Sequence, residues 1–273
     1  MPAPTATVDA ARRTTAAHLV QAPAAVVMIR PHAFAPNPQT AADNAFQRPD
    51  GADGPAARAE QAARARDEVD EAARRLRDEG VRVHLFDDAG ADTPDSVFPN
   101  NWFSTHAGGH VALFPMALPS RRRERRADVV ELLKREYRVQ DVIDYSGLEH
   151  DGLFLEGTGA MVLDHLARVA YVARSRRADP IALERFCTHF NFEPIVFDTA
   201  DARGRAVYHT NVLMAVGTGF ALVGFDLFAS PHQAADVRAR LAEAGREVIA
   251  LDARQVAEFA ANAQELRGRD GPL

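Results

Sequence analysis

A succession of strand pair, helix and strand recurs along most of this sequence, and it constrains the fold more than any other feature. Each recurrence has two apolar strand-like runs joined at a short turn, then an amphipathic helix, then another strand. The strand pairs begin at Asn101, Gly159, Asn211 and Asn262. The resulting period of roughly 50 to 60 residues is typical of a repeat architecture. Hairpins that alternate with helices predict an α/β fold with mixed sheets.

The elements of each repeat follow from short stretches of sequence. The first repeat contains the strand pair "NWFSTHAGGHVALFPM", a helix over 122–136 and the strand "DVIDYS". The second contains "GAMVLDHLARVAYVARS", the helix "PIALERFCTHFN" and the strand "EPIVFD". The third contains "NVLMAVGTGFALVGF", the helix "HQAADVRARLAEAG" and the strand "EVIALD".

A fourth strand pair begins near the end of the sequence. A short helix over 253–261 leads into "NAQELRGRDGPL", which predicts a first strand and its turn. The partner strand is not in the sequence, and an unpaired edge is a liability for a stable sheet. We therefore expect the natural domain to continue past Leu273.

Before the first repeat, the sequence predicts a strand over 24–31 and a helix over 56–80, followed by a strand over 81–87. Between the first two lies a stretch rich in Pro, Asn, Asp and Gly, and long loops of this kind are often functional. We expect residues 1–23 to form a flexible N-terminal segment and residues 24–273 to form one domain.

Charge, cysteine content and hydropathy exclude several classes of protein. The 38 acidic and 32 basic residues give a net charge of -6, so no nucleic-acid partner is expected, and the run "RRRERR" over 121–126 reads as a solvated helix start. The sequence has neither a signal-peptide core nor a membrane-spanning run of about 20 apolar residues. Its only cysteine, Cys187, excludes an internal disulfide and fits a reducing cytoplasm, where we expect the protein to act.

Polar side chains stand just before the first strand of the repeats, in "DSVFPNNW", "LFLEGTGAMVLD" and "VYHTNVLM". Equivalent ends of repeated units converge on the axis of a ring, so we expect these side chains to share one central pocket. A histidine and a glutamate that meet in a cleft are suited to general acid–base chemistry. The set comprises Asp95, Asn100, Asn101, Glu156, His209 and Asn211.

Taken singly, these residues also have structural interpretations. The two adjacent asparagines fit a turn, and His209 fits a structural histidine. Glu156 follows an apolar run, where a carboxylate is rarely left unpaired, so both interpretations stay open for it. Cys187 lies in a predicted amphipathic helix and reads as a small buried hydrophobe, not as a nucleophile. No metal-binding signature is present in the sequence.

Several long motifs resemble those of a known family. "MIRPHAFAPNPQTAADNAFQ", "DSVFPNNWFSTH", "LEGTGAMVLD", "YHTNVLMAVG" and "FAANAQELRG" are similar, in this order, to motifs of the citrulline utilization hydrolases. That group is amidinotransferase-related and belongs to the guanidino-modifying pentein superfamily. The resemblance, which begins at about Met28, implies a fivefold pseudosymmetric α/β propeller.

The resemblance also implies a reaction. A cysteine thiolate attacks the central carbon of a guanidino or ureido group, and water then hydrolyses the covalent intermediate. This chemistry needs no metal or organic cofactor, and its partner is a small amino-acid substrate. A homo-oligomer is compatible with it.

Site roles follow from the same resemblance. Glu156 is expected to hold the substrate nitrogens and His209 to act as general acid and base. Arg30 is expected to meet the substrate carboxylate. The reacting group is expected to be contacted or oriented by Asp95, Phe98, Asn100, Asn101 and Asn211.

Two departures from the superfamily pattern are informative. Asn101 and Asn211 stand where arginine deiminases carry carboxylates, and an amide suits a neutral ureido group such as that of citrulline better than a cationic guanidinium. The family's nucleophilic cysteine lies in a glycine-rich segment that this sequence lacks, so we expect these residues alone to be inactive in hydrolysis. An arginine deiminase, an amidinotransferase and a catalytically inactive amino-acid-binding relative remain alternatives.

Overall fold

The structure is a computed structural model that describes residues 19–41, 44, 46–47, 54–88, 90 and 92–273. Within these residues the strands are three to six residues long. They are β1 Ala25–Arg30, β2 Arg82–Asp87, β3 Phe103–His106, β4 His110–Leu113, β5 Asp141–Asp144, β6 Met161–Asp164, β7 Val169–Ala173, β8 Glu193–Phe197, β9 Met214–Val216, β10 Phe220–Val223 and β11 Glu247–Ala250. The α-helices are α2 Pro55–Asp78, α3 Pro119–Arg122, α4 Ala127–Glu136, α5 Gly157–Ala160, α6 Pro180–Phe190, α7 Pro231–Glu243 and α8 Ala253–Ala257.

The three predicted repeats are confirmed as units of hairpin, helix and strand. In the first unit β3 pairs antiparallel with β4, and β4 pairs parallel with β5 after the crossover helix α4. The second unit has the same order, β6-β7-β8 with α6, and the third unit has β9-β10-β11 with α7. Gly108 and Gly109 close the first hairpin with φ of 91° and 85°, a conformation that glycine adopts without steric cost.

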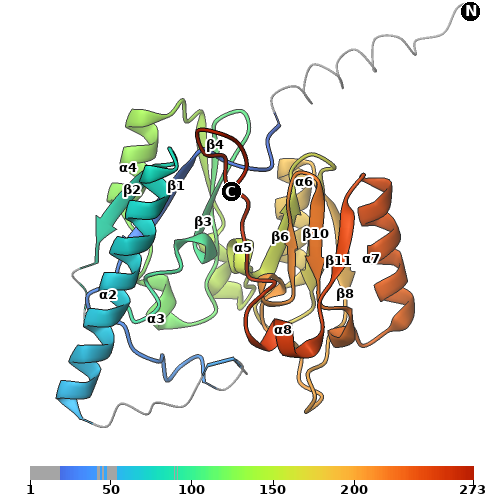
Figure 1. The fold of residues 1–273 in the computed structure, drawn as a ribbon, viewed down its shortest axis with the longest axis horizontal. Helices are drawn as coiled ribbons and strands as arrows, with labels where there is room; N and C mark the ends of the chain where they lie inside the picture. Colours follow the sequence, from blue (N-terminus) through green and yellow to red (C-terminus); the bar gives the residue numbers. More distant parts are fainter. Residues whose placement is uncertain (1–18, 42–43, 45, 48–53, 89, 91) are drawn as a thin grey trace, which may run out of the picture.

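The N-terminal elements form a related half-unit. Strands β1 and β2 pair in parallel, and α2 connects them. In Figure 1, α2 and α4 lie on the side of β1 to β5, α7 lies at the opposite outer side beside β11, and α6 lies behind β6 and β10. The C-terminal segment, drawn in dark red, runs between the two groups.

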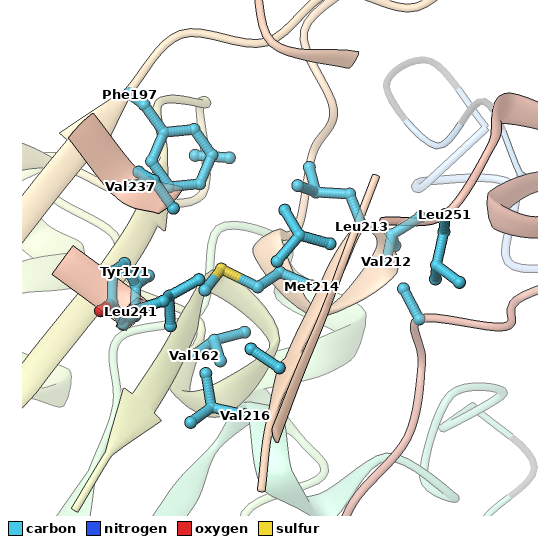
Figure 2. Packing of buried hydrophobic residues seen from close by; sticks show 14 of the residues in the cluster. Val162, Tyr171, Phe197, Val212, Leu213, Met214, Val216, Val237, Leu241 and Leu251 are labelled. Atoms are coloured by element: carbon cyan, nitrogen blue, oxygen red, sulfur yellow. The ribbon is translucent and has the colours of Figure 1, made fainter. Parts of the chain in front are cut away.

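Buried apolar residues fill the space between each three-stranded sheet and its helix. The largest cluster joins the second and third units, and Figure 2 shows Val162 of β6, Met214 of β9 and Leu241 of α7 within it. A second cluster packs α6 on β6 and β7, and a third packs α4 on β3 and β4. Each fully buried large apolar side chain contributes roughly 1.5–3 kcal/mol to folding. This packing holds the sheets in place, and with them the residues that precede the first strand of each repeat.

One predicted helix begins later than expected. The helix predicted over 122–136 is interrupted, because α3 ends at Arg122 and Arg126 has an extended backbone with φ of -119° before α4 begins. The interruption turns two of the charged side chains of this run into the protein interior, as described below.

Both ends of the predicted domain also differ from expectation. Within the predicted flexible segment 1–23, residues 1–18 lie outside the described residues, but the Gln21 amide donates to the carbonyl oxygens of Leu163 and Val216 at 2.9 Å each. The expected first strand of a fourth pair does not form a regular strand. Instead, Leu266 and Leu273 exchange two backbone hydrogen bonds around a turn that contains two glycines and a proline. None of the described helices combines the length and apolar character needed to cross a membrane.

Candidate functional site

A cavity of about 680 Å³ lies where the first strands of the repeats begin. Asn101 ends a 3₁₀ turn before β3, Glu156 immediately precedes α5 and β6, and His209 immediately precedes a 3₁₀ turn that leads to β9. The predicted site residues that line the cavity are Asp95, Phe98, Asn100, Asn101, His209 and Asn211. Glu156 lies directly behind His209 and is fully buried. The structure therefore brings together residues that are separated by more than 100 positions.

Two glycines of the "EGTG" motif allow this close approach. Gly157 has φ of 46°, and a side chain there would meet the backbone oxygen of Asn101 at 2.9 Å. A Cβ atom on Gly159 would collide with the amide of Asn101 and lie 2.8 Å from Nδ1 of His209. Any side chain at these positions would separate the turns that carry the polar groups.

Glu156 and His209 form a buried hydrogen-bonded pair. Oε2 of Glu156 lies 2.9 Å from Nε2 of His209 and also accepts from Nη1 of Arg177 at 3.2 Å. Oε1 of Glu156 accepts from the backbone N–H of Ala117 at 3.1 Å. Both carboxylate oxygens thus have partners, as a buried charge requires.

The surroundings keep Glu156 ionised and His209 neutral. Burial acts to raise the pKa of Glu156, but the hydrogen bond from His209 and the charge of Arg177 outweigh it and hold the pKa well below its usual value. Burial lowers the pKa of His209, and this effect exceeds the opposing hydrogen bond to Glu156. An ionised carboxylate only accepts hydrogen bonds, so His209 donates through Nε2–H and its Nδ1 lone pair is left to accept a proton.

Arg121 and Glu124 contradict the prediction that the run "RRRERR" is solvated. Each of the two residues is 3% exposed, and Nε and Nη2 of Arg121 each donate to the Glu124 carboxylate at 3.0 Å. Nε of Arg121 lies 3.8 Å from Asp95, and Nη1 lies 3.9 Å from Glu156. Burial raises the pKa of Glu124 to about 7, although Arg121 opposes this shift. A spacing of three residues within a charged run was the only sequence signal for this pair.

The long loop after β1 is attached to the same site. Nδ2 of Asn37 donates to Oδ2 of Asp95 at 2.7 Å and to Oγ of Ser120 at 3.0 Å. Asn37 is 2% exposed and lines the cavity. The loop thus contributes a wall to the pocket, and Asp95 has a neutral partner on its cavity side.

Arg30 lies outside this cavity lining, contrary to its expected role. Its guanidinium donates to Asp87 at 2.7 and 2.9 Å and to Asp70 of α2 at 3.1 and 3.2 Å. Strand β1 pairs with β2 so that Arg30 faces Asp87 across the two strands, and this places the cation against carboxylates at the sheet edge.

The remaining predicted residues lie at the rim. Phe98 is 44% exposed and lines the cavity mouth. The backbone oxygen of Asn211 accepts from Nδ2 of Asn262, which also lines the cavity and was not among the predicted residues. Further residues that sequence reasoning missed are Asn37, Arg121, Glu124, Arg177 and Glu265.

Cys187 lies in the core, as predicted. It is 3% exposed within α6, and burial raises the pKa of its thiol to about 12. Such a thiol is protonated at neutral pH and does not reach the cavity. Across the part of the chain that the structure describes, no group of three or more His, Cys, Asp or Glu residues is arranged to hold a metal ion.

Comparisons with known proteins extend over nearly the whole chain. Residues 30–272 match the family described as N,N dimethylarginine dimethylhydrolase, eukaryotic. No curated protein is significantly similar in sequence.

Solved structures share the fold. The structure of ArgZ, an arginine dihydrolase from the ornithine–ammonia cycle in cyanobacteria, superposes with a TM-score of 0.66 and 17% identity over 88% of this chain and 33% of ArgZ. The N-terminal domain of a cysteine-to-serine variant of ArgZ, bound to substrate, superposes with a TM-score of 0.68 and 16% sequence identity over 90% of this chain and 81% of that domain. A dimethylarginine dimethylaminohydrolase adduct superposes with a TM-score of 0.54 and 14% sequence identity over 84% of this chain and 77% of that chain.

The chain thus spans about a third of full-length ArgZ and most of its N-terminal domain, and at these identities the superpositions establish the fold alone. The sequence match over residues 30–272 carries the family assignment. The chain belongs to the N,N dimethylarginine dimethylhydrolase family.

Proposed function

We propose that this chain binds the ureido group of citrulline, or of a related amino acid, and moves protons during hydrolysis of its carbon–nitrogen bond. The buried pair of Glu156 and His209 at the cavity carries the proposal. A carboxylate that fixes one ring nitrogen leaves the other poised as a proton acceptor, which is the arrangement of general acid–base catalysis.

Amide side chains favour a neutral reacting group. Asn100, Asn101 and Asn211 line the cavity beside this pair. The cavity carboxylates already have partners: Asp95 accepts from Asn37, and Glu265 accepts from Thr218 N–H and Oγ at 2.6 Å each. A ureido group offers both N–H donors and a carbonyl acceptor, so amides satisfy it without burying an uncompensated charge.

In the proposed reaction His209 takes the proton of a nucleophilic thiol, the resulting thiolate adds to the central ureido carbon, and His209 delivers this proton to the departing nitrogen. His209 then takes a proton from the water that hydrolyses the thiocarbamate-type intermediate, and the thiolate is released. Cys187 cannot act as this nucleophile, because it is buried in the core and protonated at neutral pH. Substrate binding and proton transfer are therefore the roles proposed for these residues.

The family name and the activity of ArgZ make a guanidino substrate the main rival. An arginine deiminase or an amidinotransferase would use the same histidine and glutamate. Ammonia release from arginine in preference to citrulline would favour the deiminase, and amine-dependent product formation would favour the transferase. Citrulline binding without turnover would favour a catalytically inactive relative.

Calorimetric titration of the 273-residue chain tests recognition. We expect citrulline to bind more tightly than arginine, and ornithine, which has no ureido group, to bind weakly. Expression of the complete reading frame tests turnover: His209→Asn is expected to lower kcat by about 100- to 10,000-fold. Cys187→Ser serves as the matched control and should retain activity. Turnover of arginine but not citrulline by the wild-type protein would refute the proposal.

A further inference from the structure

Phe259 has a backbone conformation that a large side chain rarely adopts. It follows the short helix α8, and its φ of 60° lies in the left-handed region. Helices commonly end with a residue in this region, but that residue is usually glycine, because a Cβ atom is strained there. A bulky residue in this conformation is an outlier, and such outliers cluster at functional sites.

The chain reversal at Phe259 ties the end of α8 to the cavity. The N–H of Ala260 donates to the carbonyl oxygen of Gln255 at 3.0 Å and closes the helix. The N–H of Asn262 donates to the Phe259 oxygen at 3.0 Å, and its side-chain Nδ2 donates to the Asn211 oxygen at 3.1 Å. None of these bonds involves the phenyl ring, and all of them could form with glycine in its place. They account for the left-handed turn but not for the side chain.

The ring of Phe259 is exposed at the cavity. Phe259 is 46% exposed and lines the same cavity as His209. Its ring contacts that of Phe46 from the long loop, with the two centroids 5.6 Å apart. Phe98 places a second exposed ring on the cavity lining. Apolar surface in water is unfavourable, so a ligand that covers these rings gains free energy of binding.

We propose that Phe259 is a substrate-contacting residue whose ring packs on the methylene chain of the bound amino acid. This inference rests on the proposed function, which supplies an amino acid as the ligand. The pair of Glu156 and His209 gives the cavity polar groups for the reacting head, and the exposed rings give it apolar surface for the stem. Citrulline and arginine carry the same methylene chain, so the contact does not depend on which head group the site prefers.

The contact can be observed directly. In the complex of the 273-residue chain with citrulline, nuclear Overhauser effects should connect the methylene protons of the ligand to the ring protons of Phe259. The variant Phe259→Leu identifies these ring signals by their loss. Bound citrulline that shows no such effects would overturn the inference.

The variant Phe259→Gly supplies a second readout. Glycine adopts the left-handed turn without strain and leaves the backbone hydrogen bonds in place. We expect the dissociation constants of citrulline and arginine to rise together by about 3- to 10-fold, the range for burying roughly half of a phenylalanine side chain. The denaturant midpoint should not fall, because relief of the strain offsets the lost contact with Phe46. A purely structural ring would give the reverse, a lower midpoint with unchanged dissociation constants.

Asn191 provides the matched control. It ends α6 in the same left-handed region, with φ of 54°, and it lies outside the cavity lining. Asn191→Gly removes a side chain from an equivalent helix end, and it should leave both dissociation constants at their wild-type values.

The outcomes separate this inference from the proposed function. If citrulline binds without contact to Phe259, and Phe259→Gly binds it as tightly as wild type, the inference is refuted while the proposed function stands. If the wild-type protein prefers arginine, the preference for a ureido group is refuted, and the same effects and the same variant test the contact in the arginine complex. If neither amino acid binds, both proposals are refuted.

Discussion

Replacement of Glu156 by glutamine tests whether a buried charge organises this site. The substitution keeps the shape of the side chain and removes its charge. Glu156 is fully buried and accepts from His209 at 2.9 Å, from Arg177 at 3.2 Å and from the Ala117 backbone at 3.1 Å. A glutamine has one acceptor oxygen in place of two, so at least one of these donors loses its partner, and the Glu156 charge that pairs with the Arg177 cation is removed.

The expected cost follows from that geometry. Breaking a buried ion pair by removal of one partner costs about 3–5 kcal/mol, and we expect the free energy of unfolding to fall by this amount. Because Glu156 raises the pKa of His209, its neutralisation should lower the His209 pKa still further. Denaturant unfolding at about pH 7 measures the first quantity, and NMR titration of the imidazole measures the second.

The pH dependence gives the sign of the effect. The pKa of Glu156 is lower in the folded protein than in the unfolded chain, so its stabilisation is fully present above the unfolded pKa of about 4.5 and is lost as pH falls toward the folded value. The Glu156→Gln protein should lack this loss. Glu265→Gln is the control, because Glu265 is also buried at the cavity but accepts from Thr218 and not from a cation. A loss below about 1 kcal/mol for Glu156→Gln would mean that Glu156 is already neutral, and the ion pair assigned to the site would be wrong.

Three further outcomes are expected. Gly159→Ala should weaken citrulline binding about 10-fold or more, because the new Cβ atom collides with the Asn101 amide and the His209 imidazole. Gly147→Ala is the control, because a Cβ atom there would have no neighbour within 4 Å, and it should leave binding unchanged in calorimetry. His106 is buried and its pKa lies well below the usual value, so the histidine of the unfolded chain is protonated first and the free energy of unfolding decreases as pH drops below about 6.5. His106→Phe should reduce this pH dependence by up to about 1.4 kcal/mol per pH unit, as measured by denaturant unfolding at several pH values. An unchanged pH dependence would contradict this prediction. Cys187→Ala should cost about 1 kcal/mol of stability and leave ligand binding intact, and rapid reaction of native Cys187 with a thiol reagent at about pH 8 would count against its burial.

The sequence by itself determined the repeats and the phase of the polar residues. Apolar runs, glycine turns and amphipathic helices are local patterns, and each is decided by neighbours a few residues away. The turn at Gly108 and Gly109 and the placement of Glu156 and His209 before their strands followed from such patterns. The regular strand expected from Asn262 onward did not form, because the segment is dominated by its glycine turn and its Arg267 N–H donates to the backbone oxygen of Pro23.

Only the tertiary structure decided which charges are buried and what they face. Arg121 and Glu124 were predicted to be solvated in a basic run, yet both are buried. Arg121 lies 3.8 Å from Asp95 and 3.9 Å from Glu156, which come from other parts of the chain, and it pairs with Glu124. Arg30 was expected to bind the substrate carboxylate, but its guanidinium donates to Asp87 and Asp70 at the edge of a sheet. Charged groups interact through space over a few ångströms, whereas a sequence pattern specifies only which residues follow one another. The repeat could therefore be predicted from the sequence, but the charge pairs at the cavity could not.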